Sequence, residues 1–267
     1  MAFIVDIADP SDPRVDDFRD LNSVDRRPDL PAGKGLVIAE GVLVAQRMLS
    51  SRFAPFALFG VERRRLELGA DLDGADVPFY RASAEVMAEV VGFHLNRGVL
   101  AAAYRPPSLS VDDVLDGART VAVLEGVNDH ENIGSIFRNA AGLGADAVLF
   151  GKGTADPLYR RAVRVSMGHV LRVPFATIED WPNLNSLRDK GFQIIALTPD
   201  PAAQPLAVAM TGARVALLLG AEGPGLTERA MRQTDVRARI PMAPGTDSLN
   251  VATAAAMAFY ERVRMTP

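Results

Sequence analysis

Short apolar runs alternate with amphipathic stretches between residues 34 and 105 of the chain. The amphipathic stretches carry apolar residues at three- and four-residue spacing, which is the pattern of a helix with one buried face. We therefore predict a compact unit of four strands and three helices. The strands are expected at residues 35–40, 55–61, 76–82 and 98–106, and the helices at residues 41–51, 62–72 and 83–93.

After residue 118 the alternation resumes with longer and more continuous apolar runs. Runs without a polar face are typical of parallel strands that helices cover on both sides. The predicted fold class is therefore α/β in both halves, with a parallel sheet in the second. Its strands are expected at residues 120–127, 146–151, 169–176, 192–198, 214–220 and 236–242.

A proline-bearing break separates the two halves. Pro106 and Pro107 interrupt the pattern, and a polar stretch follows them. We predict a smaller first domain over residues 1–107 and a second domain over residues 118–267. The charged segment at residues 9–31 is expected to form an arm or a short helix.

Composition narrows the functional classes. With 29 basic and 33 acidic residues, the formal charge is −4, so any nucleic-acid site must be a local patch. The absence of cysteine excludes disulfides, thiolate metal sites and cysteine nucleophiles. We find neither a secretory signal nor an apolar run long enough to span a membrane, and expect a soluble, cytoplasmic protein.

The first candidate motif is the sequence NIGSIFRNA at residues 132–140. Read as a helix, it places Ile133, Ile136 and Phe137 on a buried stripe and Asn132 and Arg138 on the opposite side. Asn132 also suits the N-cap. On spacing alone an ordinary surface helix is the favoured explanation, but short amides and hydroxyls around one arginine indicate a functional face.

The second candidate motif, LLLGAEGPGL at residues 217–226, leads a buried strand into a turn with three glycines. Glycine lets backbone approach a ligand closely, and Thr227 can cap a following helix. The turn matches neither a P-loop nor the GxGxxG dinucleotide spacing. By itself it is either a ligand loop or a plain strand-to-helix turn.

The third candidate motif, IPMAPGTDSLNVATAAA at residues 240–256, joins a strand to an alanine-rich helix through a Pro/Gly loop. Ser248 is expected to cap that helix. Asn250 adds a polar donor and acceptor nearby. A cap alone and a functional serine are both compatible with this pattern.

The three motifs in this order resemble those of the SpoU/TrmH family of RNA ribose 2′-O-methyltransferases, in the SPOUT superfamily. The sequence at residues 35–49 also resembles the start of the ribosomal-protein-like (L30e-like) RNA-binding domain that many members carry. The resemblance implies a trefoil knot in the second domain, S-adenosylmethionine as methyl donor, no metal, and a homodimer. RNA is the implied substrate, ribosomal RNA more than transfer RNA.

The resemblance also implies roles for individual residues. Arg138 is the implied catalytic centre, and its high pKa makes it an electrostatic group for a phosphate or the developing 2′-oxyanion rather than a proton acceptor. Asn132, Ser248 and Asn250 are implied to position the nucleotide and the arginine. The implied donor-binding residues are Leu219, Gly220, Glu222, Gly223, Ile240, Met242 and Leu249.

Alternatives remain open at this point. The chain could methylate transfer RNA, or it could be a non-catalytic RNA-binding or ribosome-assembly protein on the same fold. A nicotinamide-dependent oxidoreductase is disfavoured by the missing GxGxxG. A group of arginines forms either a phosphate patch or a solvated helix face: Arg160, Arg161, Arg164 and Arg172.

Overall fold

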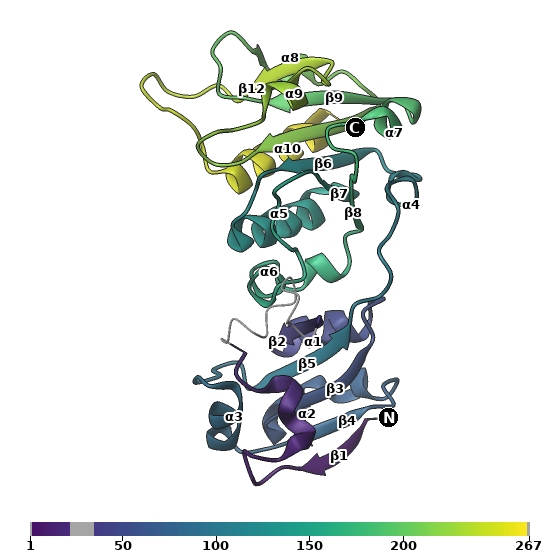
Figure 1. The fold of residues 1–267 in the computed structure, drawn as a ribbon, viewed down its shortest axis with the longest axis vertical. Coiled ribbons are helices and arrows are strands. Elements are labelled where there is room, and N and C mark those ends of the chain that lie inside the picture. Colours follow the sequence, from purple (N-terminus) through teal and green to yellow (C-terminus); the bar gives the residue numbers. More distant parts are fainter. Residues whose placement is uncertain (1, 22–34, 266–267) are drawn as a thin grey trace. The chain divides into compact units, whose positions relative to one another are not determined.

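The structure is a computed structural model that describes residues 2–21 and 35–265. The chain divides into two compact units (Figure 1). The first combines Met1–Pro107 with Asp156–Arg172, and the second combines Ser108–Ala155 with Val173–Pro267. Each unit is described by itself.

The first unit is built on a five-stranded sheet in the order β1-β4-β3-β5-β2. Strand β5 pairs antiparallel with β2 and β3, whereas β4 pairs parallel with β1 and β3. All four predicted strands and all three predicted helices are present. The strands are β1 (Phe3–Asp6), β2 (Leu36–Glu40), β3 (Pro55–Gly60), β4 (Pro78–Arg81) and β5 (Val99–Tyr104), and the helices are α1 (Val42–Leu49), α2 (Glu62–Leu68) and α3 (Ala84–Val91).

Two features of this unit differ from the sequence pattern. Strand β1 was not predicted, because its four residues are largely exposed at the sheet edge and show no alternation. Within the predicted arm, a 3-10 helix forms at Pro13–Phe18 and is capped by Asp12. The rest of the arm, residues 22–31, lies outside the described residues.

The segment Asp156–Arg172 packs in the first unit, although we had predicted it within the second domain. It contains α6 (Arg160–Val165) and the 3-10 helix His169–Leu171. The strand expected at residues 169–176 is therefore wrong in its first half, and only β8 (Phe175–Thr177) is extended. Gly168 adopts a positive φ and lies against α1, which turns the chain before a strand can begin.

The second unit is built on a sheet of seven parallel strands in the order β10-β12-β9-β11-β6-β7-β8. This confirms the predicted parallel α/β sheet. Besides β8, its strands are β6 (Thr120–Glu125), β7 (Ala147–Phe150), β9 (Phe192–Leu197), β10 (Gln204–Pro205), β11 (Arg214–Gly220) and β12 (Val236–Arg239). Its helices are α4 (Val111–Leu115), α5 (His130–Leu143), α7 (Asn185–Asp189), α8 (Leu206–Ala209), α9 (Glu228–Met231) and α10 (Val251–Met265).

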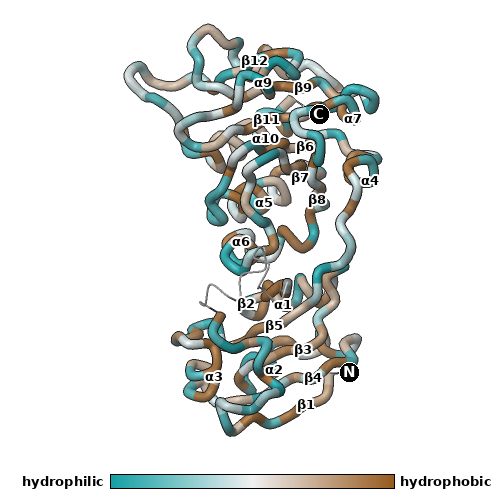
Figure 2. Tube along the Cα trace, in the orientation of Figure 1, coloured by the Kyte–Doolittle hydropathy of each residue, from teal (hydrophilic) through white to brown (hydrophobic). Residues whose placement is uncertain are grey.

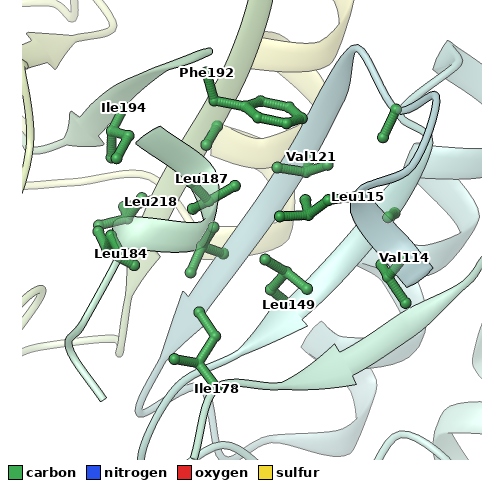
Figure 3. Packing of buried hydrophobic residues seen from close by; sticks show 14 of the residues in the cluster. Val114, Leu115, Val121, Leu149, Ile178, Leu184, Leu187, Phe192, Ile194 and Leu218 are labelled. Carbon is green, nitrogen blue, oxygen red and sulfur yellow. The ribbon is translucent and has the colours of Figure 1, made fainter. Parts of the chain in front are cut away.

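Helices cover both faces of this sheet, because its central strands β6 and β11 consist mostly of hydrophobic residues (Figure 2) and are buried along nearly their whole length. On one face Val121, Leu149 and Leu218 pack with Leu115 of α4 and Leu187 of α7 (Figure 3). Helix α4 falls inside the polar stretch at residues 108–117, which we predicted to lie between the two domains. On the other face lie α5 and α10, which pack against each other and against the sheet.

An aromatic cluster anchors α5 to the second face. Phe137 of α5 lies 5.8 Å from Phe175 and 6.1 Å from Phe150, measured between ring centroids. This packing orients α5, so its polar residues are held in a defined direction. The trefoil knot and the L30e-like character of the first unit stay predictions of the family resemblance.

In the part of the chain that the structure describes, the helices are too short or too polar to cross a lipid bilayer.

Candidate functional site

Helix α5 begins one turn earlier than we predicted. Its N-cap is Asp129, whose carboxylate accepts a hydrogen bond from the backbone N–H of Glu131 at 2.8 Å. The prediction that Asn132 caps this helix is therefore wrong, because Asp129 already occupies that position. Asn132 lies in the first turn, is buried, and has its side-chain amide available for tertiary contacts.

Helix α10 begins later than we predicted, at Val251. The side-chain oxygen of Asn250 accepts hydrogen bonds from the backbone N–H groups of Ala252 at 2.9 Å and Thr253 at 3.1 Å. Asn250 is thus the cap, and the prediction of Ser248 as the cap is wrong. Ser248 is exposed in the preceding loop, two residues too early to reach the first amides of the helix.

The side chains of three residues from the three motifs form one hydrogen-bonded cluster. Asn250 Nδ2 donates to Asn132 Oδ1 at 2.8 Å and to Glu222 Oε1 at 2.8 Å. Asn132 Nδ2 donates to the same carboxylate oxygen at 3.1 Å. Because a carboxylate strengthens the hydrogen bonds that it accepts, Glu222 holds both amides in place.

Residues 220–227, here called the glycine loop, fold tightly back on the end of β11. A Cβ atom on Gly220 would lie 2.2 Å from the backbone of Gly225 and of Leu226, so only glycine fits there. Ala221 and Gly225 form an isolated antiparallel bridge. Thr227 closes the loop as the N-cap of α9, as predicted, by accepting from the backbone N–H of Ala230.

A largely apolar pocket opens beside the glycine loop. Every residue that we expected to bind the donor lines it, and so does Ser248. The sequence interpretation missed Leu197, Thr198 and Pro199, which also line it where β9 ends. Their signal was their place at the carboxyl end of a parallel strand, where ligands of such sheets usually bind.

Arg138 lies outside this pocket lining. Its side chain is exposed on α5, and it makes no hydrogen bond or ion pair with any other residue that the structure describes. Its neighbour Asn139 donates to the backbone carbonyl of Ala252 at 3.0 Å, which ties α5 to α10. Arg138 therefore projects from a firmly held helix with its guanidinium donors available.

The arginines proposed as a phosphate patch are divided by their contacts. Arg160 pairs with the buried carboxylate of Glu40 at 2.8 Å, and Arg164 lies 3.8 Å from the same carboxylate. Arg160 is thus an internal partner of Glu40 rather than part of a solvated face. A phosphate-binding role for Arg161, Arg164 and Arg172 stays a prediction.

Histidine and acidic residues do not converge in the described ranges: no group of three that could hold a metal ion is found there. The site is instead composed of amides, one carboxylate, backbone and apolar side chains.

Comparison with known proteins places this geometry in a family. The SpoU rRNA Methylase family matches residues 119–260. The chain belongs to this family. The match spans all three motifs and most of the second unit, so it covers the cluster and the pocket together.

Relatives extend over almost the full chain. An uncharacterized tRNA/rRNA methyltransferase of Mycobacterium tuberculosis is 68% identical over 98% of this chain and 92% of its own length. The 23S rRNA (guanosine-2′-O-)-methyltransferase RlmB of Ralstonia nicotianae is 31% identical, over 76% of this chain and 83% of its own.

The fold is also that of solved methyltransferases. An AdoMet-bound rRNA methyltransferase from Sinorhizobium meliloti superimposes with a TM-score of 0.82 at 23% identity, covering 99% of both chains. The SpoU methyltransferase AviRb from Streptomyces viridochromogenes, in complex with AdoMet, gives a TM-score of 0.75 at 21% identity, covering 95% of this chain and 97% of its own. These likenesses confirm the α/β fold of this SpoU-family chain.

Proposed function

We propose that this SpoU-family protein transfers a methyl group from S-adenosylmethionine to a ribose 2′-hydroxyl of RNA, with ribosomal RNA as its substrate. The observation that carries the proposal is the hydrogen-bonded cluster of Asn132, Glu222 and Asn250 next to the apolar pocket. Polar side chains from three separate motifs meet in one hydrogen-bonded cluster, which a protein that only binds RNA does not need.

The pocket fits the methyl donor. Leu219, Ile240, Met242 and Leu249 offer an apolar surface for a flat adenine ring. The close approach of Gly220 to Gly225 leaves no room for a side chain at residue 220, so backbone N–H and C=O groups of the loop can face the ligand. When bound, S-adenosylmethionine supplies an electrophilic methyl group, and the protein has to bring the hydroxyl to it in line.

Arg138 is the proposed catalytic residue. An arginine stays protonated at all physiological pH values, so it acts by charge and by its forked donors. We assign it to the phosphate beside the target ribose or to the oxyanion that develops there. Asn132, Ser248 and Asn250 position the nucleotide, and their amide and hydroxyl groups can both donate and accept hydrogen bonds.

The proposed assembly is a homodimer. Helix α10 exposes Met257, Tyr260 and Val263, which share one helical face and are 43%, 59% and 48% exposed. An apolar face of this kind on a soluble chain is typical of an interaction surface. We propose that a second copy covers it in the cytoplasm, and that the knot and the RNA-binding role of the first unit follow the family.

Methyl transfer to defined RNA tests the function. Purified protein is incubated with methyl-labelled S-adenosylmethionine and with either ribosomal or transfer RNA from cells lacking the gene, and 2′-O-methyl positions are mapped. We expect one labelled position in ribosomal RNA. Label in transfer RNA alone would overturn the substrate assignment. Binding of the donor and of RNA without transfer would instead support the non-catalytic alternative.

A further inference from the structure

Glu125 is a buried carboxylate that the proposed chemistry does not use. It is the last residue of β6, only 6% exposed, and stands beside Gly220 in the register of β6 and β11. No basic side chain in the described ranges forms an ion pair with it. A buried charge is costly without partners, so its hydrogen bonds must account for its presence.

Both oxygens of Glu125 accept hydrogen bonds from other loops. Trp181 Nε1 donates to Oε1 at 2.6 Å, and the Thr227 hydroxyl donates to the same oxygen at 2.9 Å. The backbone N–H of Thr227 donates to Oε2 at 2.8 Å. Hydrogen bonds to an ionised carboxylate are about twice as strong as those between neutral groups.

Thr227 is the end of the glycine loop that Glu125 holds. The Thr227 hydroxyl also caps α9, because its oxygen accepts a hydrogen bond from the backbone N–H of Ala230. The same hydroxyl donates to Glu125, so Glu125 fixes the orientation of the cap. The opposite end of the loop, Gly220, continues directly from β11. The loop between these two points carries Glu222 and lines the pocket, and its shape depends on where Thr227 is held.

Trp181 is the other residue that donates a hydrogen bond to Glu125. Its ring packs on Gly151, where a Cβ atom would lie 2.6 Å from the ring. The indole is therefore held against the loop that follows β7, and it is partly buried against the core on the α4 and α7 face. Glu125 thus connects the glycine loop to Trp181, on the face of the sheet opposite α5 and α10.

We propose that Glu125 is a positioning residue for the donor pocket: through Thr227 it holds the glycine loop in the conformation that accepts S-adenosylmethionine. The inference rests on the proposed function, since it assumes that this ligand occupies the pocket. Glu125 itself does not line the pocket and acts only through the loop.

Substitution of Glu125 by glutamine is the direct test, because it keeps the shape and replaces one acceptor oxygen with a donor. We expect Glu125→Gln to raise the Kd and KM for S-adenosylmethionine by roughly tenfold. A change of this size corresponds to the loss of one hydrogen bond to a charged group. We expect kcat at saturating donor to change by less than about threefold, because the groups that meet the RNA are untouched.

Two further variants keep the test independent of the folding of Glu125→Gln. Thr227→Val removes the hydroxyl and should weaken donor binding, whereas Thr227→Ser keeps it and should restore binding. Combining Glu125→Gln with Thr227→Val should cost less than the product of the single effects, since both act on one contact.

The matched control is Leu187→Ala, which creates a cavity in the core on the same sheet face but removes none of the hydrogen bonds of Glu125. It should lower the unfolding midpoint and leave the Kd for S-adenosylmethionine unchanged. The inference is overturned if Glu125→Gln binds the donor as tightly as wild type, or if Leu187→Ala weakens binding equally. If wild type binds no S-adenosylmethionine by calorimetry, the proposed function fails instead.

Discussion

Asn250 donates its side-chain amide to Asn132 at 2.8 Å across 118 residues of sequence. The same Asn250 caps α10 through its oxygen, so one side chain both starts a helix and joins two motifs. The two roles can be tested separately, because they use different atoms of the side chain. A residue that keeps the oxygen but lacks the NH2 group should preserve the helix and lose the cluster.

Asn250→Asp makes that separation. Aspartate caps helices as well as asparagine, so the unfolding free energy should change little. The variant lacks the N–H donor and places a second carboxylate beside Glu222, so methyl transfer should fall by roughly 10- to 100-fold. Asn250→Ala is the control for the cap and should cost about 1 kcal/mol of stability. Wild-type activity in Asn250→Asp would contradict the role of the cluster.

Arg138→Ala tests the proposed catalytic centre. Because Arg138 is exposed and unbonded among the described residues, stability should be unaffected, while methyl transfer should fall by at least about 100-fold, as for loss of a charge-stabilising donor. Donor affinity, measured by calorimetry, should stay at the wild-type value. Arg229→Ala, an exposed arginine of α9, serves as the charge-matched control. Equal activity of the two variants would remove Arg138 from the mechanism.

Gly220→Ala should abolish donor binding. The added methyl group would lie 2.2 Å from the backbone at Gly225, so the loop has to open. Gly142→Ala is the opposite case, since a Cβ there meets nothing within 4 Å inside α5. That variant should gain roughly 0.5–1 kcal/mol in denaturant unfolding. Tight donor binding by Gly220→Ala would show that the loop does not shape the pocket.

The first unit should lose stability in acid through Glu62. Hydrogen bonds from Arg65, and then from Arg81, lower the pKa of Glu62 from 4.5 to about 2. A carboxylate whose pKa is lower in the folded than in the unfolded protein stabilises the fold at pH values above 4.5. This contribution is lost as the pH falls toward 2. Denaturant unfolding of Glu62→Gln between these pH values should therefore vary less than wild type. Exposed Glu89→Gln is the control, and an identical slope in Glu62→Gln would contradict the expectation.

Charge on the exposed face of α10 should dissociate the proposed dimer. The double variant Met257→Glu and Tyr260→Glu places two carboxylates where we expect a dry contact, and burying them unpaired is costly. Light scattering should give the mass of one chain for the variant and of two for wild type. Val208→Glu changes an exposed apolar residue of α8 and should remain dimeric.

Local patterns predicted most elements because hydrophobic period and strand composition are properties of neighbouring residues. The parallel strands of the second unit and the helices of the first follow their apolar spacing, and Thr227 caps α9 as its side chain suggests. Family motifs added the pocket residues as a set. The resemblance, and not the spacing, singled out Arg138.

Tertiary structure decided what local patterns leave open. Asp129 and Asn250, rather than Asn132 and Ser248, became caps, because neighbouring candidates compete and packing selects the register of each helix. Residues 156–172 joined the first unit through a buried carboxylate that lies 120 residues away in sequence. The sequence by itself indicated most of the strands and helices through their apolar patterns, and the ligand loops through the family motifs; only the order of strands in the sheet decided which loops meet, since contacts between distant residues have no local signature.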